Sequence, residues 1–344
     1  MRSGCRYGTH RVISPVGALP QSAEVLDNSI DIYDNELLIK VKTLNIDSSS
    51  FTQIKDVCNS DIFKMKEHIL EIVTGRGKMQ NPVTGSGGML TGEILKIGDK
   101  FPNKHLKVGD RIATLVSLSL TPLKIEKIKE LKLDSEQIEV DAYAILFESG
   151  LYAKMPEDIP EKLALAALDV AGAPAQVDRL VKEGDIVCII GGGGKSGILC
   201  SYQAMKNVGP YGKVIVVEYS KANADRIEKL GLATNIIIAD ATDVMSVYKQ
   251  VMEITGGRGC DITINNVNVP STEMTSILIT KGQGSVYFFS MATSFTKAAL
   301  GAEGVGKDIN LIVGNGYAKG HADLTINILR ESKEIRELFE KLFS

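Results

Sequence analysis

A glycine-rich turn between residues 191 and 197 could bind a ligand that carries phosphate groups. It contains three glycines at the spacing G-x-G-x-x-G, namely Gly192, Gly194 and Gly197. The first would form a tight turn, the second would let the backbone approach a pyrophosphate, and the third would let a helix pack closely on the preceding strand. Ser196 falls in the first turn of that helix, whose unpaired N–H groups would face the phosphates.

An acidic residue follows the turn at the distance typical of dinucleotide-binding proteins. Glu218 ends the next apolar run about 20 residues later, where its carboxylate would accept hydrogen bonds from the adenosine ribose hydroxyls. A carboxylate there repels a 2′-phosphate, so we predict NAD rather than NADP as the cofactor. Lys221 could reach the same ribose. A P-loop is excluded, because Gly191–Ser196 does not supply the spacing G-x-x-x-x-G-K-[ST].

Buried strands and amphipathic helices alternate in the half of the chain that contains the turn. We expect strands at residues 185–192, 213–220, 235–240, 260–267, 284–291 and 310–316. We expect helices at residues 161–181, 195–208, 222–231, 244–257 and 322–343. Strands without polar alternation, separated by amphipathic helices, predict a parallel sheet that is covered on both faces.

The first half is predicted to be mainly β-structure. Residues 36–46 alternate apolar and polar side chains, as a half-buried strand does, and residues 87–98 and 108–120 repeat this pattern between glycines. One helix is expected at residues 60–73. The fold class is therefore α/β, with a β-rich part followed by a doubly wound parallel sheet.

Composition excludes several classes of protein. The chain has 344 residues and a formal net charge of −3, which suggests about two domains and provides no basic field for nucleic acid. No apolar run approaches the roughly 20 residues that span a membrane, and the first residues lack the apolar core of a secretory signal. The five cysteines are scattered without a C-x-x-C pair, which is typical of reduced thiols, so we expect a cytoplasmic enzyme.

The order of these parts resembles the medium-chain dehydrogenase/reductase family. The resemblance rests on the glycine turn and on VGDRIAT (108–114), PEDIPEKLALAA (156–167) and residues 241–267. It implies a GroES-like β-rich catalytic domain over residues 1–160, joined by the C-terminal segment 317–344. It also implies a Rossmann domain over residues 161–316.

This chain departs from the zinc-dependent members of that family. Asp47 takes the place of their catalytic cysteine, the segment 85–88 reads Gly-Ser-Gly-Gly where they carry Gly-His-Glu, and their cysteine tetrad is absent. A third ligand would fall near Asp169. Because Asp47 and Asp169 alone make a poor zinc site, we expect no metal.

Two further stretches resemble a narrower family, the L-erythro-3,5-diaminohexanoate dehydrogenases. These stretches are residues 7–28 and 299–323. The resemblance implies oxidative deamination of a small diamino acid with NAD during lysine fermentation, giving 5-amino-3-oxohexanoate and ammonia. We also expect a homodimer.

Oxidation of an amine requires a base, and a carboxylate is both a natural base and a natural partner for ammonium groups. Asp47 and Asp169 stand where the zinc-dependent relatives direct their ligands at the reacting carbon. The resemblance therefore makes them the first candidates for catalysis, and Glu148 a third.

Residues of the two family-specific stretches are candidates for binding the substrate. A substrate carboxylate needs cations, and arginine offers a bidentate grip. The N-terminal candidates are Tyr7, His10 and Arg11. The C-terminal candidates are Asn315, Tyr317, Lys319 and His321.

Two other functions remain open at this point. A zinc-free quinone or enoyl reductase of the same superfamily would use NADPH, which Glu218 disfavours. A non-catalytic nucleotide-binding protein on this fold would have no need of the acidic residues Asp47 and Asp169.

Overall fold

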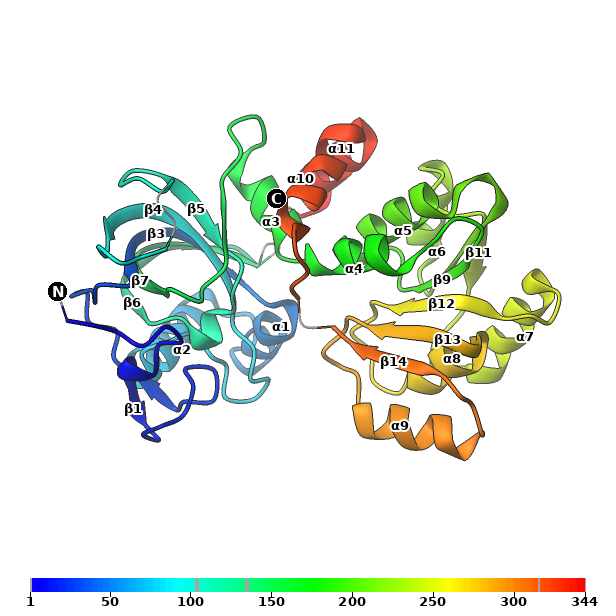
Figure 1. Ribbon diagram of the computed structural model, residues 1–344, viewed down its shortest axis with the longest axis horizontal. Helices are drawn as coiled ribbons and strands as arrows, with labels where there is room; N and C mark the ends of the chain where they lie inside the picture. Colours follow the sequence, from blue (N-terminus) through cyan, green and yellow to red (C-terminus); the bar gives the residue numbers. More distant parts are fainter. Residues whose placement is uncertain (1, 103–104, 134–135, 315, 344) are drawn as a thin grey trace. The chain divides into compact units, whose positions relative to one another are not determined.

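The computed structural model describes residues 2–102, 105–133, 136–314 and 316–343, and they divide into two compact units (Figure 1). Unit 1 ends at Asp169, and unit 2 comprises Val170–Phe343. We expected the first domain to end at residue 160 and to be joined again by residues 317–344. The C-terminal helices α10 (His321–Glu331) and α11 (Lys333–Phe343) instead contact other helices of unit 2.

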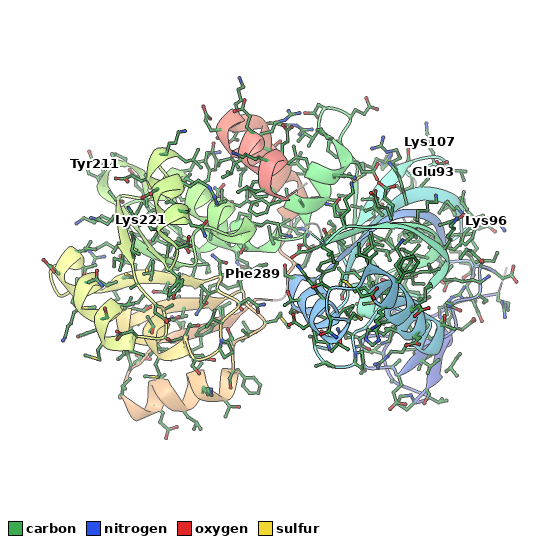
Figure 2. All side chains as sticks on the ribbon, turned by 180° about the vertical axis from the view of Figure 1, so that it is seen from behind. Glu93, Lys96, Lys107, Tyr211, Lys221 and Phe289 are labelled. Carbon is green, nitrogen blue, oxygen red and sulfur yellow. The ribbon has the colours of Figure 1, made fainter. Side chains whose placement is uncertain are left out.

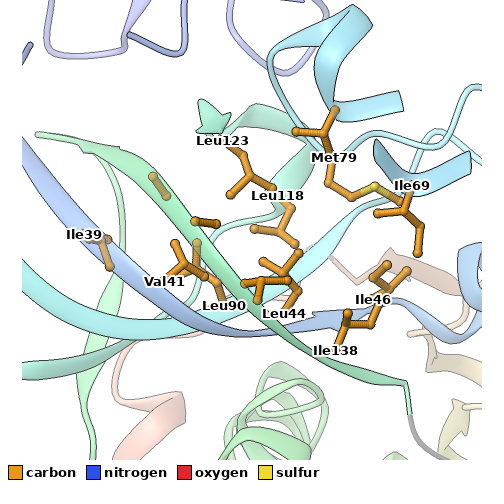
Figure 3. Close-up of a cluster of buried hydrophobic side chains, with 14 of the residues drawn as sticks. Ile39, Val41, Leu44, Ile46, Ile69, Met79, Leu90, Leu118, Leu123 and Ile138 are labelled. Carbon is orange, nitrogen blue, oxygen red and sulfur yellow. The ribbon is translucent and has the colours of Figure 1, made fainter. Parts of the chain in front are cut away.

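Unit 1 is built on an antiparallel sheet of six strands in the order β6-β7-β3-β4-β5-β8. Its strands are β3 (Glu36–Ile46), β4 (Gly88–Ile97), β5 (Arg111–Thr114), β6 (Leu123–Leu131), β7 (Gln137–Phe147) and β8 (Tyr152–Lys154). The apolar side chains of β3 and its neighbours form the core of this unit, in which Leu44, Leu90 and Ile138 are fully buried (Figure 3). Charged side chains such as Lys96 and Lys107 point outward (Figure 2).

Two short strands and several helices complete unit 1. They are η1 (Thr9–Arg11), β1 (Val12–Ser14), β2 (Val25–Leu26), α1 (Ser48–Val57), α2 (Ile62–Arg76), η2 (Leu118–Leu120) and α3 (Glu161–Leu168). Helix α2 matches the predicted helix, and the Asp61 side chain caps it by accepting hydrogen bonds from the next turn. Helix α1 was not predicted, because its serine-rich first turn has low helix propensity. Burial of Phe51 and Ile54 in the core stabilises it.

Unit 2 contains a parallel sheet of six strands in the order β11-β10-β9-β12-β13-β14. In order along the chain this is 3-2-1-4-5-6, the strand order of a Rossmann sheet, which confirms the predicted fold class. The strands are β9 (Ile186–Ile190), β10 (Lys213–Glu218), β11 (Asn235–Ile238), β12 (Cys260–Asn265), β13 (Thr280–Phe288) and β14 (Asn310–Val313). The remaining helices are α4 (Gly172–Leu180), α5 (Lys195–Val208), η3 (Gly209–Tyr211), α6 (Lys221–Lys229), α7 (Val244–Thr255), α8 (Glu273–Ile279) and α9 (Phe295–Gly304).

Two helices that we predicted to be continuous are each broken in the structure. The predicted helix at residues 161–181 is divided into α3 and α4, and the division between the two units falls in the intervening turn. The predicted C-terminal helix is divided at Ser332, whose extended backbone ends α10 and whose hydroxyl accepts a hydrogen bond from the Ile335 N–H. Within the described ranges, no helix combines the length and the apolar character needed to cross a membrane.

Candidate functional site

Asp47 lies at the corner where β3 ends and α1 begins. It occupies the N-cap position of α1, but its side chain does not cap that helix. Its Oδ2 instead accepts a hydrogen bond of 3.0 Å from the Gly87 N–H, just before β4. The neighbouring Gly88 has a φ of +118°, and a Cβ there would lie 1.9 Å from the Asn45 carbonyl oxygen. The glycines in this loop therefore allow β4 to approach β3 closely enough for the loop backbone to bind Asp47.

The surroundings of Asp47 disfavour its charged form. Burial raises the pKa of Asp47, the negative charge of Asp169 raises it further, and Glu136 adds to the effect. Hydrogen bonds from the Gly87 N–H and the Ser86 side chain act in the opposite direction. The resulting pKa of Asp47 is about 6, against an ordinary value of 3.8. Asp47 can therefore exchange a proton near neutral pH, as a general base does.

The structure brings Asp169 into the same electrostatic environment. Asp169 is half-buried at the C-cap of α3, within unit 1, and its charge acts directly on Asp47. Two carboxylates whose charges repel each other are more stable when one is protonated or when a cation lies between them. The pair is suited to hold an ammonium group.

Glu148 does not join this pair, contrary to our expectation. In the pairing of β3 with β7, Asn45 lies opposite Gln137 while Glu36 lies opposite Phe147, so Glu148 follows the far end of the two strands. At about 3.3 Å per residue, the length of β3 separates the two ends by roughly 30 Å. Asn35 Nδ2 donates a hydrogen bond of 3.1 Å to Glu148.

Arg11 is also not available to a substrate, because it is completely buried. Its Nε and Nη2 donate hydrogen bonds of 2.7 Å to the two carboxylate oxygens of Glu36, and Nη1 donates to the Ser29 carbonyl at 3.0 Å. His10 is similarly engaged, since its Nδ1 accepts from the Cys5 N–H and its Nε2 bonds to Glu36, each at 2.8 Å. The predicted substrate-binding role of Arg11 and His10 is therefore corrected to a structural one.

Glu36 is the residue of this cluster that the sequence analysis missed. Burial by itself raises its pKa, but hydrogen bonds from Arg11 and His10 outweigh that effect and lower the pKa of Glu36 to about 2. An acidic residue followed by three apolar residues at the start of a half-buried strand was the available signal. A buried carboxylate such as Glu36 needs a buried cation as its partner, and Arg11 is the nearby candidate.

The remaining predicted substrate residues are distributed over both units. Tyr7 is exposed in unit 1, with the Arg6 guanidinium 5.7 Å from its ring centroid. In unit 2, Tyr317 and His321 meet edge to face with ring centroids 5.2 Å apart, and burial lowers the pKa of His321. Lys319 is exposed, and Asn315 lies outside the described residues.

The glycine turn has room for a ligand at one position and is closed at another. A Cβ on Gly194, the N-cap of α5, would meet nothing within 4 Å, and no side chain caps this helix end. A Cβ on Gly197 would lie 2.0 Å from the Gly191 carbonyl oxygen. The first observation fits a backbone that a pyrophosphate approaches, and the second confirms the close packing of helix on strand. Gly192 is buried in the turn, and Ser196 is half-buried in the first turn of α5.

Glu218 is fixed against this turn at the carboxyl end of β10. Its Oε2 accepts a hydrogen bond of 2.8 Å from the Gly193 N–H, and its Oε1 accepts one of 3.1 Å from the Ser220 N–H. Lys221 pairs at 3.0 Å with Asp225 on the surface, where such a pair is weak and can be exchanged for a ligand (Figure 2). The open position at Gly194, the uncapped helix and the held carboxylate fit a dinucleotide.

Across the described residues, no group of three or more His, Cys, Asp and Glu side chains is arranged to hold a metal ion. Asp47 and Asp169, whose charges interact, are therefore not part of such a group among these residues.

An antiparallel β-rich unit followed by a Rossmann unit with this glycine turn is the fold expected from the resemblance to medium-chain dehydrogenases/reductases, and solved oxidoreductases share it. The zinc dependent alcohol dehydrogenase 2 from Streptococcus pneumonia matches with a TM-score of 0.55 and 17% identity, over 90% of this chain and 82% of that chain. A mycobacterial protein complexed with NADPH matches with a TM-score of 0.52 and 18% identity, over 89% of this chain and 80% of that chain. These similarities show the fold.

Sequence comparison defines the family within this class. The family model of the L-erythro-3,5-diaminohexanoate dehydrogenase N-terminal domain matches residues 10–156. The L-erythro-3,5-diaminohexanoate dehydrogenase of Acetoanaerobium sticklandii is 56% identical over 341 residues, which cover 99% of each chain. That of Fusobacterium nucleatum is 56% identical over 344 residues, 100% of each chain. The chain belongs to the L-erythro-3,5-diaminohexanoate dehydrogenase family.

The structural role of Arg11 predicts a loss of stability in Arg11→Ala. Removing one partner of a buried ion pair should lower the free energy of unfolding by about 3–5 kcal/mol at pH 7. The pKa of Glu36 is lowered from 4.5 to about 2, so the pair stabilises the protein above pH 4.5 and this contribution disappears as the pH falls toward 2. Urea unfolding of wild type and Arg11→Ala at several pH values measures this difference in the free energy of unfolding. Arg6→Ala, which removes an exposed cation, is the control and should change stability by less than about 1 kcal/mol. Wild-type stability in Arg11→Ala would contradict this role.

The raised pKa of Asp47 predicts that Asp47→Asn stabilises the protein. Between pH 3.8 and about 6 the unfolded protein loses the Asp47 proton while the folded protein keeps it, so wild-type stability falls as the pH rises through this range. Asparagine carries no charge, and the variant should gain up to about 3 kcal/mol at pH 8 and nothing near pH 4. Urea unfolding at the two pH values tests the difference. The control is Asp141→Asn, because Lys40 lowers the pKa of that aspartate. A variant that is less stable than wild type at pH 8 would show that the charge is not destabilising.

Proposed function

We propose that the protein oxidises L-erythro-3,5-diaminohexanoate with NAD to 5-amino-3-oxohexanoate and ammonia. The observation that carries the proposal is the 56% identity over the full chain with two curated dehydrogenases of this substrate. The paired carboxylates Asp47 and Asp169 support it from the geometry, because they suit an ammonium substrate. We place this reaction in the lysine fermentation of the cytoplasm and propose that the enzyme is a homodimer.

The residues of the glycine turn would hold NAD. Gly192 and Gly194 would face the pyrophosphate together with Ser196 and the uncapped first turn of α5, and Glu218 would bind the adenosine ribose hydroxyls. When bound, the nicotinamide ring supplies the acceptor for the hydride that leaves the substrate C3 atom.

Proton transfer at the C3 amine is the part of the reaction that unit 1 can perform. The substrate binds as an ammonium group, and Asp169 would hold it through charge. Asp47 would take one proton from that group, which frees the nitrogen lone pair to drive the departure of hydride and form an iminium ion. Asp47 then releases this proton to solvent. Water adds to the iminium carbon while Asp47 takes a proton from the water and passes it to the nitrogen, so that ammonium leaves. In total one water is consumed, and one ammonium ion and one proton are released.

Lys319 is the cation that we propose for the substrate carboxylate, together with Tyr317 and Asn315. His321 remains a proposed contact as a neutral hydrogen-bond partner, because burial lowers its pKa. Lys319 is exposed in unit 2, as a group that binds a ligand from solvent must be before binding. Tyr7 remains a proposed contact from the N-terminal stretch.

Loss of either carboxylate should greatly reduce turnover. We expect Asp47→Asn and Asp169→Asn to lower kcat/KM for the diamine by roughly a hundredfold or more, because each removes a base or an ammonium partner. In the wild type, kcat/KM should fall as the pH drops through about 6, where Asp47 becomes protonated. Formation of NADH and release of ammonia are measured together, with and without a chelator, which should have no effect.

Asp141→Asn is the control for this experiment, since it removes a surface carboxylate from the same sheet. Near-wild-type activity in both Asp47→Asn and Asp169→Asn would place the amine site elsewhere. A wild-type protein that releases no ammonia from the diamine would refute the proposed function itself.

Preference for NAD should depend on Glu218. We expect Glu218→Ser to lower the kcat/KM ratio of NAD to NADP by at least tenfold, because the repulsion of a 2′-phosphate is removed. Glu218→Gln is the matched variant, since it retains an acceptor for the Gly193 N–H and separates the effect of charge from that of turn geometry. A wild type that uses both cofactors equally would contradict this role of Glu218.

A further inference from the structure

Three hydroxyl groups form a connected network beside Asp47: Ser86, Ser50 and Thr84. Ser50 Oγ lies 2.6 Å from Ser86 Oγ and 2.6 Å from Thr84 Oγ1. Ser86 Oγ and Thr84 Oγ1 are 3.2 Å apart. Ser86 directly precedes Gly87, whose N–H donates to the Asp47 carboxylate, and the Ser86 side chain acts on that carboxylate by lowering its pKa. Ser50 is completely buried, whereas Thr84 is exposed. The network therefore begins at Asp47 and ends at the surface of the protein.

The loop that carries Ser86 and Thr84 is held in place by Asn81, which is completely buried. The Asn81 side-chain oxygen accepts a hydrogen bond of 2.8 Å from the Val83 N–H, and its Nδ2 donates one of 2.7 Å to Gln53 Oε1 of helix α1. The Asn81 N–H donates at 2.9 Å to the Ser86 carbonyl. These bonds fix the loop against α1, the helix that supplies Ser50.

We propose that Ser86, Ser50 and Thr84 form a proton relay between Asp47 and solvent. The inference rests on the proposed function, in which Asp47 takes one proton from the substrate ammonium group in each turnover and must release it to solvent. It concerns positioning residues that act through Asp47 and need not touch the substrate.

Proton balance along the network is simple. Protonated Asp47 donates its proton to Ser86 Oγ while the Ser86 O–H proton moves to Ser50 Oγ. The Ser50 proton moves to Thr84 Oγ1, and the Thr84 proton passes to a water molecule. Each hydroxyl gains one O–H bond and loses one, because a hydroxyl can donate and accept at once. One proton leaves Asp47 and one proton enters solvent.

The other groups that face Asp47 do not offer this route. The Gly87 N–H donates a hydrogen bond but cannot pass a proton on. Asp169 at the end of α3 and Glu136 before β7 act on Asp47 through their negative charge, which favours its protonated form. Ser86 is the neighbour whose hydroxyl continues into further hydroxyls.

The experiment compares Ser86→Ala with Ser86→Thr, which keeps the hydroxyl. We expect kcat of Ser86→Ala to fall at least tenfold and to recover in a linear manner with added imidazole, a small base that can replace the relay. We expect Ser86→Thr to keep most of the activity without imidazole. Loss of the Ser86 hydrogen bond should also move the acidic limb of the kcat/KM profile to higher pH. Ser119→Ala, which removes another buried hydroxyl of unit 1, is the control.

The outcomes separate this proposal from the proposed function. A wild type without deaminase activity would refute the function and the relay together. An active wild type with a Ser86→Ala kcat that is unchanged, or is reduced without imidazole rescue, would overturn the relay alone. If Ser86→Ala does not fold, the double variant Ser50→Ala/Thr84→Val interrupts the same path, and imidazole-dependent activity in it supports the relay while imidazole-independent activity overturns it.

Discussion

The free energy required to bury a carboxylate is the constraint on which unit 1 depends. A carboxylate is buried at each end of strand β3, and its surroundings differ between the two ends. At one end, Glu36 is completely buried and bonded to Arg11, so its pKa is lowered to about 2 and the N-terminal segment is fixed to the sheet. At the other end, Asp47 has hydrogen-bond donors but faces the carboxylate of Asp169, and its pKa is raised to about 6. One strand therefore carries a permanent charge that stabilises the fold and a variable charge suited to catalysis.

The corner around Asp47 shows how one fold can be adapted to another chemistry. The resemblance described above implies that zinc-dependent members of the class carry cysteine and histidine ligands where this chain carries Asp47 and Ser86. A carboxylate with a raised pKa and a hydroxyl network can move protons, whereas a zinc site would polarise an oxygen. The close approach of β4 to β3 at Gly88 is what lets the loop backbone bind this carboxylate. Chemistry here is decided by side chains placed on a shared scaffold.

The glycine turn of unit 2 combines two requirements, the packing of helix α5 on the sheet and the space for a phosphate. Gly197 is required by packing, because any larger side chain would meet the Gly191 carbonyl, while Gly194 leaves open the space that a phosphate would use. Glu218 contributes to both the turn and the proposed ligand site, since it holds the Gly193 N–H and lies where a ribose would bind. In the proposed function, cofactor preference and turn geometry would thus be coupled through one carboxylate.

The sequence by itself determined the features that local patterns encode. Period-two alternation, apolar runs and the glycine spacing predicted β3, β4 and β5 of unit 1, the strands of the parallel sheet, the glycine turn and the class of fold, because each depends on residues close in the chain. Strands β6, β7 and β8 were not predicted. Tertiary structure decided the other features, which are helix α1, the break between α3 and α4, and the roles of Arg11 and Glu148. Arg11 bonds to Glu36, which is 25 residues away in the sequence. The register of β3 and β7 places Glu148 at the end of β3 that is distant from Asp47. Such partners are set by burial and pairing between distant segments, which no local pattern contains.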